Sequence, residues 1–235
     1  MNNALGARRQ FGDGPLSRAA ALIYTVLVVE LLFLVTTAPG LVALMLLERD
    51  VSNLPLAAAC TLPLGPAGSA ALYTLHHQRP DPTDLHPARV FWRGYRANLA
   101  DVLRIWVPLL LWLTVIAVNL AHLPAAGVPR WWAVPLVLIG AGVTLVGVNA
   151  LVIASLFSFR FRDVLRLARY FLARTPAVTL GNAGLLVATA ALTVLTSEAV
   201  VAALGALLAL ALLVGSRPMI TAIREDFTPR AAKSA

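Results

Sequence analysis

The chain contains six apolar runs, each about as long as a helix that crosses the hydrocarbon core of a bilayer. They cover approximately residues 19–47, 54–77, 103–123, 131–158, 177–196 and 199–216. Apart from Arg104 at one edge, the runs contain no lysine or arginine. Backbone groups must be hydrogen-bonded in lipid, and these runs are too long for barrel strands, so each is predicted to form a helix.

The overall composition supports a membrane protein. Hydrophobic residues make up 59% of the 235 residues and charged residues only 13%, whereas about 25% of a soluble domain is charged. A soluble chain of this length could not bury so much apolar surface, but a bilayer accommodates it. The predicted fold is therefore all-α: a polytopic membrane bundle of six transmembrane helices over residues 19–216.

The basic residues are concentrated on one side of this topology. Three lie in the tail 1–18, five in the link 78–104, five in the link 159–176 and four in the tail 217–235. Only Arg49 and Arg130 occupy the other links. This asymmetry in short loops predicts that both tails are cytoplasmic. It also accounts for the net charge of +8, so we expect contact with anionic lipid rather than nucleic acid.

Glu30 is the only acidic residue embedded in a predicted span. It lies about ten residues from the cytoplasmic edge, which places it near the bilayer centre at 1.5 Å per residue. An intramembrane carboxylate suggests a binding or proton-transfer site, with Asn149 as a candidate partner. The structural alternative is a protonated side chain that is hydrogen-bonded inside the bundle. Tyr73 and Asn182 are predicted to lie further toward the cytoplasm.

The second span contains Pro63, Gly65, Pro66 and Gly68. Each proline removes a backbone donor, which predicts a bent or locally unwound helix whose freed carbonyls bond to neighbours. Small residues let helices approach closely in membranes, and this is the commoner explanation for the pattern. Broken helices also line binding sites in transporters. A midplane site that includes Tyr73 is therefore the alternative.

Two amphipathic helices are predicted at the cytoplasmic interface, over about 88–101 and 160–173. Apolar anchors recur at helical spacing, with arginines on another side, which is typical of helices lying in the interface. The candidate interface residues are Phe91, Trp92, Arg93, Tyr95, Arg96, Arg162, Arg166 and Arg169. Lipid anchoring and protein docking are both open explanations for them.

The sequence contains no pattern that predicts a cofactor, a metal site or catalysis. Cys60 is the single cysteine, and the histidines and acids around His76 and His86 do not have the spacing of a tetrahedral zinc site. No nucleophile–base pair lies in the spans, and Glu30 alone could not supply both acid and base. We therefore expect a non-enzymatic protein.

One stretch resembles a known family. Leu62-Pro-Leu-Gly-Pro-Ala-Gly-Ser-Ala-Ala-Leu-Tyr73, followed by Phe91-Trp-Arg-Gly-Tyr-Arg-Ala-Asn-Leu99, resembles the YesL-like family of bacterial integral membrane proteins. Pro63 departs from the threonine that the family more often has before its Gly-Pro step. Members are often encoded beside carbohydrate ABC importers, so the resemblance implies the bacterial cytoplasmic (inner) membrane and a link to sugar uptake.

Two functions follow as expectations. The first is an accessory or regulatory protein for carbohydrate uptake, which contacts ABC importer subunits through its cytoplasmic-face helices. The alternative is a small transporter or channel with a midplane site near the second helix and Glu30. The expected partners are the bilayer and importer subunits, and a homo-oligomer is left open.

Overall fold

The computed structural model describes residues 15–77 and 86–226, and every regular element in these ranges is a helix, as predicted. The elements are α2 (Pro15–Leu46), η1 (Val51–Asn53), α3 (Leu54–Cys60), α4 (Leu64–His76), α5 (Pro87–His122), η2 (Arg130–Trp132), α6 (Ala133–Leu156), α7 (Phe161–Arg174), α8 (Pro176–Leu195), α9 (Glu198–Ala202), α10 (Gly205–Gly215) and α11 (Arg217–Asp226). Parts of the predicted tails 1–18 and 217–235 and of the predicted link 78–104, namely residues 1–14, 227–235 and 78–85, lie outside the described residues.

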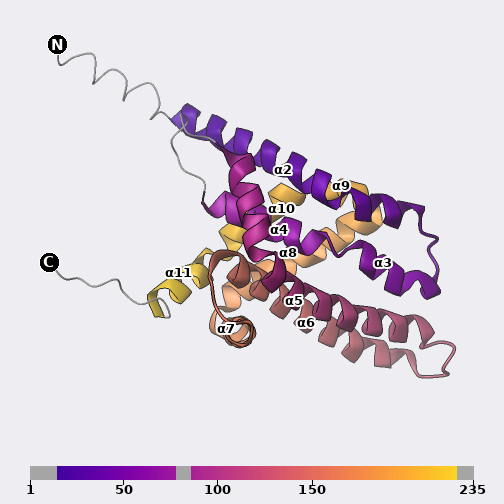
Figure 1. The fold of residues 1–235 in the computed structure, drawn as a ribbon. Helices are drawn as coiled ribbons and strands as arrows, with labels where there is room; N and C mark the ends of the chain where they lie inside the picture. The colour runs from indigo at the N-terminus through magenta and orange to yellow at the C-terminus, as the bar shows by residue number, and fades with distance from the viewer. Residues whose placement is uncertain (1–14, 78–85, 227–235) are drawn as a thin grey trace, which may run out of the picture.

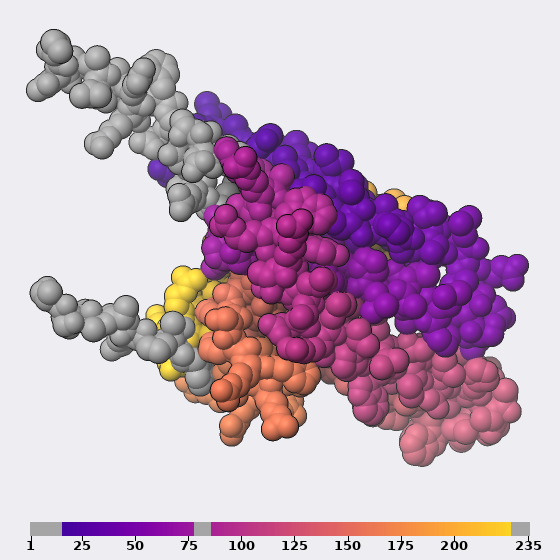
Figure 2. Space-filling model, viewed as in Figure 1, coloured from indigo at the N-terminus to yellow at the C-terminus, as the bar shows by residue number. Residues whose placement is uncertain are grey.

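Helix α4 lies at the centre of the bundle. It packs against α2, α5, α6 and α10, and most of its residues are buried. The long helices α2, α5 and α6 run across the view, whereas α7 is seen nearly end-on and therefore lies across one end of the bundle (Figure 1). In the space-filling view α2, α5 and α7 form much of the surface (Figure 2).

The predicted membrane character is confirmed at the level of the helices. In the described ranges, five helical segments are long and apolar enough to cross a membrane: 16–46, 51–76, 87–122, 130–156 and 176–195. A sixth requires α10 and α11 to be counted together, although their axes meet at 52°. Large apolar side chains are exposed along these helices, as expected of surfaces that face lipid.

Charge distinguishes the two ends of the bundle. We call one the arginine-rich end; it carries Arg89, Arg93, Arg96, Arg162, Arg166, Arg169 and Arg224. We call the other the opposite end; it carries Glu48, Arg49, Asp50, Arg130 and Glu198. Figure 1 shows α7, α11 and the start of α2 at the arginine-rich end, and the α2–α3 and α5–α6 links at the opposite end.

The second span is broken, as its prolines predict. Helix α3 ends at Cys60, and α4 begins at Leu64 after a turn. The last span was expected to be one helix over 199–216, and this expectation is wrong. Helix α9 ends at Ala202, and α10 begins at Gly205. The side chains of Glu30 and Phe33 pack at this break.

Helix α5 corrects a second boundary. The sequence predicts an interfacial helix that ends near residue 101 and a separate span from residue 103. In the structure, Pro87–His122 is one helix of 36 residues. At 1.5 Å per residue it is about 54 Å long, well beyond the roughly 30 Å of a hydrocarbon core. No proline interrupts it before Pro108, so the first half continues the axis of the span.

The predicted C-terminal tail is also partly helical. Helix α11 begins at Arg217 and buries Met219, Ile220 and Ile223. These side chains join the main apolar core, which also contains residues of α4, α5, α6 and α7. Their spacing of one, three and four residues places them on one side of the helix, which explains why this segment packs against the bundle.

Candidate functional site

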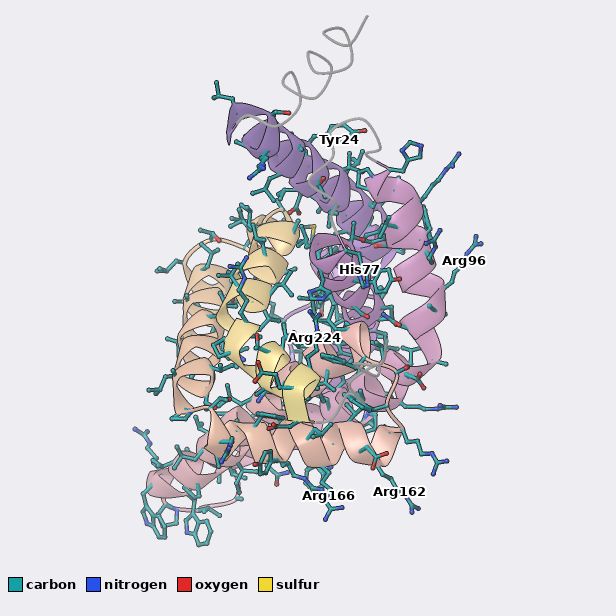
Figure 3. All side chains as sticks on the ribbon, turned by 90° about the vertical axis from the view of Figure 1, so that its left-hand side faces the viewer. Tyr24, His77, Arg96, Arg162, Arg166 and Arg224 are labelled. Atoms are coloured by element: carbon teal, nitrogen blue, oxygen red, sulfur yellow. The ribbon has the colours of Figure 1, made fainter. Side chains whose placement is uncertain are left out.

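The first candidate surface is formed by the beginning of α5. Trp92, Arg93 and Arg96 are exposed and line a shallow depression with Arg89. The arginines make no ion pair with any residue that the structure describes. Figure 3 looks onto this end of the molecule and shows Arg96 extending away from the bundle. The surface therefore presents several cations on a rigid helix.

The apolar side of the same segment faces the protein core, contrary to the expectation that it faces lipid. Phe91 is fully buried, Val102 is buried, and the half-buried Tyr95 packs against the same core. Phe91 and Tyr95 lie with their rings 6.4 Å apart and stacked. The predicted stripe exists, but α4 and its neighbours cover it, because α5 continues as a span beside α4. Of the predicted interface residues here, Trp92, Arg93 and Arg96 remain accessible.

Helix α7 supplies the second group of arginines. Val164, Leu167, Ala168 and Phe171 are buried against the core, whereas Phe161, at the start of the helix, is exposed. The predicted residues Arg162, Arg166 and Arg169 lie on the outer side and are exposed, and Figure 3 shows Arg162 and Arg166 pointing outward. Arg169 donates its Nε–H to the carbonyl oxygen of Leu165 at 3.2 Å.

The charge pattern places the tail 217–235 on the side of this end, but it does not predict that the tail forms a helix in contact with α4. Arg224 Nη2 lies 3.0 Å from His76 Nε2, at the end of α4. Because an arginine can only donate, this contact requires a neutral histidine whose Nε2 accepts. His77, the next residue, lies with its ring 4.1 Å from that of Tyr73. The amphipathic spacing of α11 was the sequence signal that could have identified it.

The residues of the broken second span serve helix packing. Trp106 of α5 donates its indole N–H to the carbonyl oxygen of Thr61 at 3.1 Å, and this oxygen, which lies in the break, also accepts from the backbone N–H of Leu64 at 3.1 Å. A Cβ on Gly65 would lie 2.5 Å from Cγ of Trp106, so only glycine allows this approach. Pro66 is buried, and Pro63 precedes the first turn of α4.

Tyr73 also packs against a glycine. A Cβ on Gly94 of α5 would lie 2.6 Å from Cδ1 of Tyr73. The tyrosine therefore fixes the distance between α4 and α5 at the arginine-rich end. Gly65 and Tyr73 thus pack against α5, whereas Pro63 lies beside Gly40 of α2.

Glu30 caps the start of α10. Its Oε2 accepts a hydrogen bond from the backbone N–H of Ala206 at 2.7 Å, and a carboxylate interacts favourably with the start of a helix. Its Oε1 is buried without a hydrogen-bond partner among the described residues. Asn149, the expected partner of Glu30, instead accepts at Oδ1 from Nδ2 of Asn182 at 3.1 Å. Both asparagines are buried.

Another polar contact joins three helices. Ser155 Oγ of α6 donates to Ser69 Oγ of α4 at 2.8 Å, and Asn98 Nδ2 of α5 donates to the backbone carbonyl of Ser155 at 3.1 Å. Sequence analysis did not identify this cluster. Its members hydrogen-bond to one another and to the backbone, which is a common way to join helices in a membrane.

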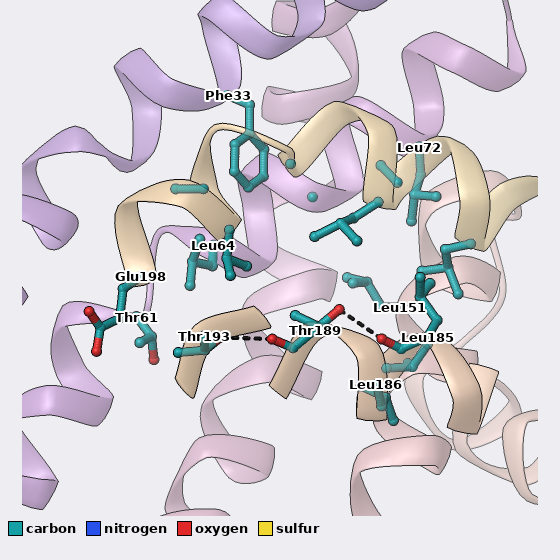
Figure 4. Close-up of a pocket in the computed structure, with 18 of the residues that line it drawn as sticks. Phe33, Thr61, Leu64, Leu72, Leu151, Leu185, Leu186, Thr189, Thr193 and Glu198 are labelled. Atoms are coloured by element: carbon teal, nitrogen blue, oxygen red, sulfur yellow. Dashed lines mark hydrogen bonds between the residues drawn. The ribbon is translucent and has the colours of Figure 1, made fainter. Parts of the chain in front are cut away.

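The structure also contains an apolar cavity that sequence analysis missed. It has a volume of about 340 Å³ and lies between α2, the break in the second span, α8, α9 and α10 (Figure 4). Gly68 is the one predicted binding residue on its wall. Most other wall residues are apolar, and apolar residues are expected anywhere in a span, so the sequence carried no distinguishing signal.

The described residues do not form a metal centre, because no three histidine, cysteine or acidic residues come together there.

At the opposite end, the hydroxyl and backbone N–H of Ser52 donate to Asp50 Oδ1 at 2.5 and 2.8 Å. These bonds hold the pKa of the Asp50 carboxyl below its usual value. Glu198 pairs there with Arg49 at 3.4 Å.

Comparison with known proteins links part of this architecture to a family. The sequence profile of the family described as "Protein of unknown function, DUF624" matches residues 26–120, from α2 to near the end of α5. No curated protein and no solved structure matches the chain. YesL-like proteins belong to DUF624, and the Gly-Pro segment and the Phe91–Leu99 stretch both lie in the matched region. Over these residues the chain is similar to that family.

Proposed function

We propose that this chain is a non-enzymatic protein of the bacterial cytoplasmic membrane that docks a carbohydrate ABC importer, or its regulator, through its arginine-rich end. The cytoplasmic orientation is supported by the charges of the two ends. The described part of the arginine-rich end carries many more arginines than acids, whereas the opposite end has three acids and two arginines. Positive charge in short loops favours the cytoplasmic side.

Docking is supported by one observation above all: exposed arginines without described ion-pair partners are held on two helices whose other sides are buried. Arg93 and Arg96 are on α5, and Arg162 and Arg166 are on α7. Packing fixes both helices, so little conformational freedom of the backbone would be lost on binding. A partner with an acidic surface would be attracted and oriented by such charges.

The proposal of a non-enzymatic role is supported by how the polar groups inside the bundle are used. The side chains of Ser69, Ser155, Asn149 and Asn182 hydrogen-bond to each other or to the backbone. In the part of the bundle that the structure describes, these four side chains join helices, and none of them lies in these contacts beside a base. The connection to carbohydrate import is supported only by the resemblance to the YesL-like family.

Copurification from native membranes tests the proposal. The protein is isolated in a mild detergent and bound proteins are identified by mass spectrometry, using the original chain, the double variant Arg93→Glu/Arg96→Glu, and Arg130→Glu as the control at the opposite end. We expect importer subunits with the original chain and with Arg130→Glu, and their loss with the double variant. Recovery of the protein and lipid alone would contradict docking and favour lipid anchoring.

A small transporter or channel is the second candidate. It is favoured by the position of Glu30, an intramembrane carboxylate that meets the broken last span at Ala206 inside the bundle, since broken helices line the sites of many transporters. Proton flux into proteoliposomes tests it, with Glu30→Gln compared with the original chain. Flux that depends on Glu30 would support transport, and absence of flux in both proteins would remove this candidate.

A further inference from the structure

The apolar cavity lies inside the membrane-spanning part of the bundle. Phe33 of α2, Leu64 and Leu72 of α4, and Leu185 and Leu186 of α8 are on its wall, and Figure 4 shows these side chains arranged around one space. Its volume of about 340 Å³ falls in the range of small-molecule sites, roughly 300–1,000 Å³. Apolar cavities of this kind stay dry and accept apolar guests.

The hydroxyl groups on the wall have their hydrogens in use. Thr189 donates to the carbonyl of Leu185 at 2.8 Å, Thr193 donates to that of Thr189 at 2.9 Å, and Thr61 donates to that of Ala58 at 2.7 Å. Two of these bonds are drawn in Figure 4. The other polar side chains on the wall, Asn182 and Glu198, lie at its two ends, so a ligand rich in hydroxyl groups, such as a sugar, would replace few of its bonds to water. The chemistry of the wall therefore selects an apolar chain.

The length of the cavity wall fits one acyl chain. On α8 the lining extends from Asn182 to Thr193, which is about 16 Å at the 1.5 Å rise per residue of a helix. This distance is about half of the roughly 30 Å hydrocarbon thickness of a bilayer, or one leaflet. Asn182 closes the end nearer the arginine-rich end through its bond to Asn149.

The other end of the cavity adjoins a polar concavity. Leu44 and Glu198 line both spaces, and the concavity, of about 750 Å³, is also lined by Glu48, Arg49 and Asp50. Three carboxylates and one guanidinium make this region negative, so an anionic group would be repelled there. Glu198 and Thr61 lie together at this end of the cavity in Figure 4.

We propose that the cavity binds the hydrocarbon chain of an amphiphile from the bilayer, with a polar, non-anionic head in the concavity beside Glu198. The cavity places this molecule in the leaflet at the opposite end of the bundle. The inference is independent of the docking function, which uses the arginine-rich end.

Native mass spectrometry of the intact protein in a nonionic detergent tests the proposal, with two single-chain lipids as probes. Lysophosphatidylethanolamine has an amine in its head, whereas lysophosphatidylglycerol is anionic. We expect one molecule of the first to bind and the second to bind more weakly. Leu186→Trp places a larger side chain in the cavity, and Val187→Trp is the matched control, because Val187 is the next residue and is 69% exposed.

The expected result is at least about tenfold weaker binding to Leu186→Trp, since excluding two methylene groups already corresponds to that factor. Val187→Trp should bind like the original chain. If Leu186→Trp does not fold, Gly68→Leu replaces it as the cavity variant. Gly68 lies on the wall, and a Cβ added there would be 3.9 Å from its nearest neighbour, Leu151 Cδ2, so the backbone has room for a side chain. Equal binding to cavity and control variants would overturn the proposed site. Equal binding of both lipids would overturn the head-group assignment.

Discussion

Trp106 donates its indole N–H to the carbonyl oxygen of Thr61, at the point where the second span is interrupted. The contact joins residues 45 positions apart and gives a second donor to a carbonyl oxygen that also accepts from the backbone N–H of Leu64. The ring of the same tryptophan lies over Gly65. A break that would be costly in lipid is thus stabilised by one side chain from the neighbouring helix.

Trp106→Phe is expected to destabilise the bundle by about 1 kcal/mol, because it removes the donor and keeps most of the ring. Unfolding in mixed micelles measures this change. Trp112→Phe is the control, since Trp112 is on the same helix and 60% exposed. Equal stability of the Trp106 variant and the control would show that the hydrogen bond contributes little.

Gly40→Ala should be more damaging than other glycine substitutions. An added Cβ would meet the backbone carbonyl oxygen of Cys60, which cannot rotate away as a side chain can, so we expect a loss of about 1–3 kcal/mol. Gly142→Ala is the matched control, because an added Cβ there meets no atom within 4 Å. The same unfolding measurement compares them, and a loss with Gly142→Ala as large as that with Gly40→Ala would contradict the packing explanation.

Asn149 and Asn182 should be energetically coupled. A double-mutant cycle with Asn149→Ala and Asn182→Ala is expected to give a coupling of about 0.6 kcal/mol and at most about 1.7 kcal/mol, the average and the maximum for hydrogen bonds between membrane helices. Stability of the four proteins is measured in the same micelles. Additive effects of the two substitutions would mean that the 3.1 Å contact does not stabilise the packing of α6 against α8.

Glu30 is expected to act mainly as a cap for α10. Glu30→Gln keeps an acceptor for the N–H of Ala206, so it should change stability by less than about 0.5 kcal/mol, whereas Glu30→Leu should cost about 0.5–2 kcal/mol. Thermal unfolding in detergent compares the two variants. Similar losses for both would show that the charge, rather than the acceptor, is what α10 requires.

The spans and the break near Pro63 were predictable, because length, hydropathy and proline act locally. The break between α9 and α10 was not, since the residues that pack against it, Glu30 and Phe33, come from the first span. Asn149 was identified as a buried polar residue, but the prediction that it pairs with Glu30 was wrong. Depth along a helix does not specify which way a side chain points, and only packing places it against Asn182.

The candidate surface was predicted only in part, because the pattern of one helix does not specify which neighbour its side chains face. Periodicity separated arginines from apolar residues on both segments, and the arginines are indeed exposed. It did not distinguish an apolar side that faces lipid from one that faces protein, and Phe91 proved to be core. The 340 Å³ cavity depends on how several helices diverge, which single-helix patterns do not encode.

The docking surface is tested most directly by site-specific photo-crosslinking in native membranes. A photoreactive amino acid replaces Trp92 at the arginine-rich end or, as the control, Trp131 at the opposite end; both tryptophans are exposed. The account predicts that position 92 crosslinks to an ABC importer subunit and that position 131 does not. Crosslinks from position 92 to lipid alone, or the same protein partner from both positions, would contradict it.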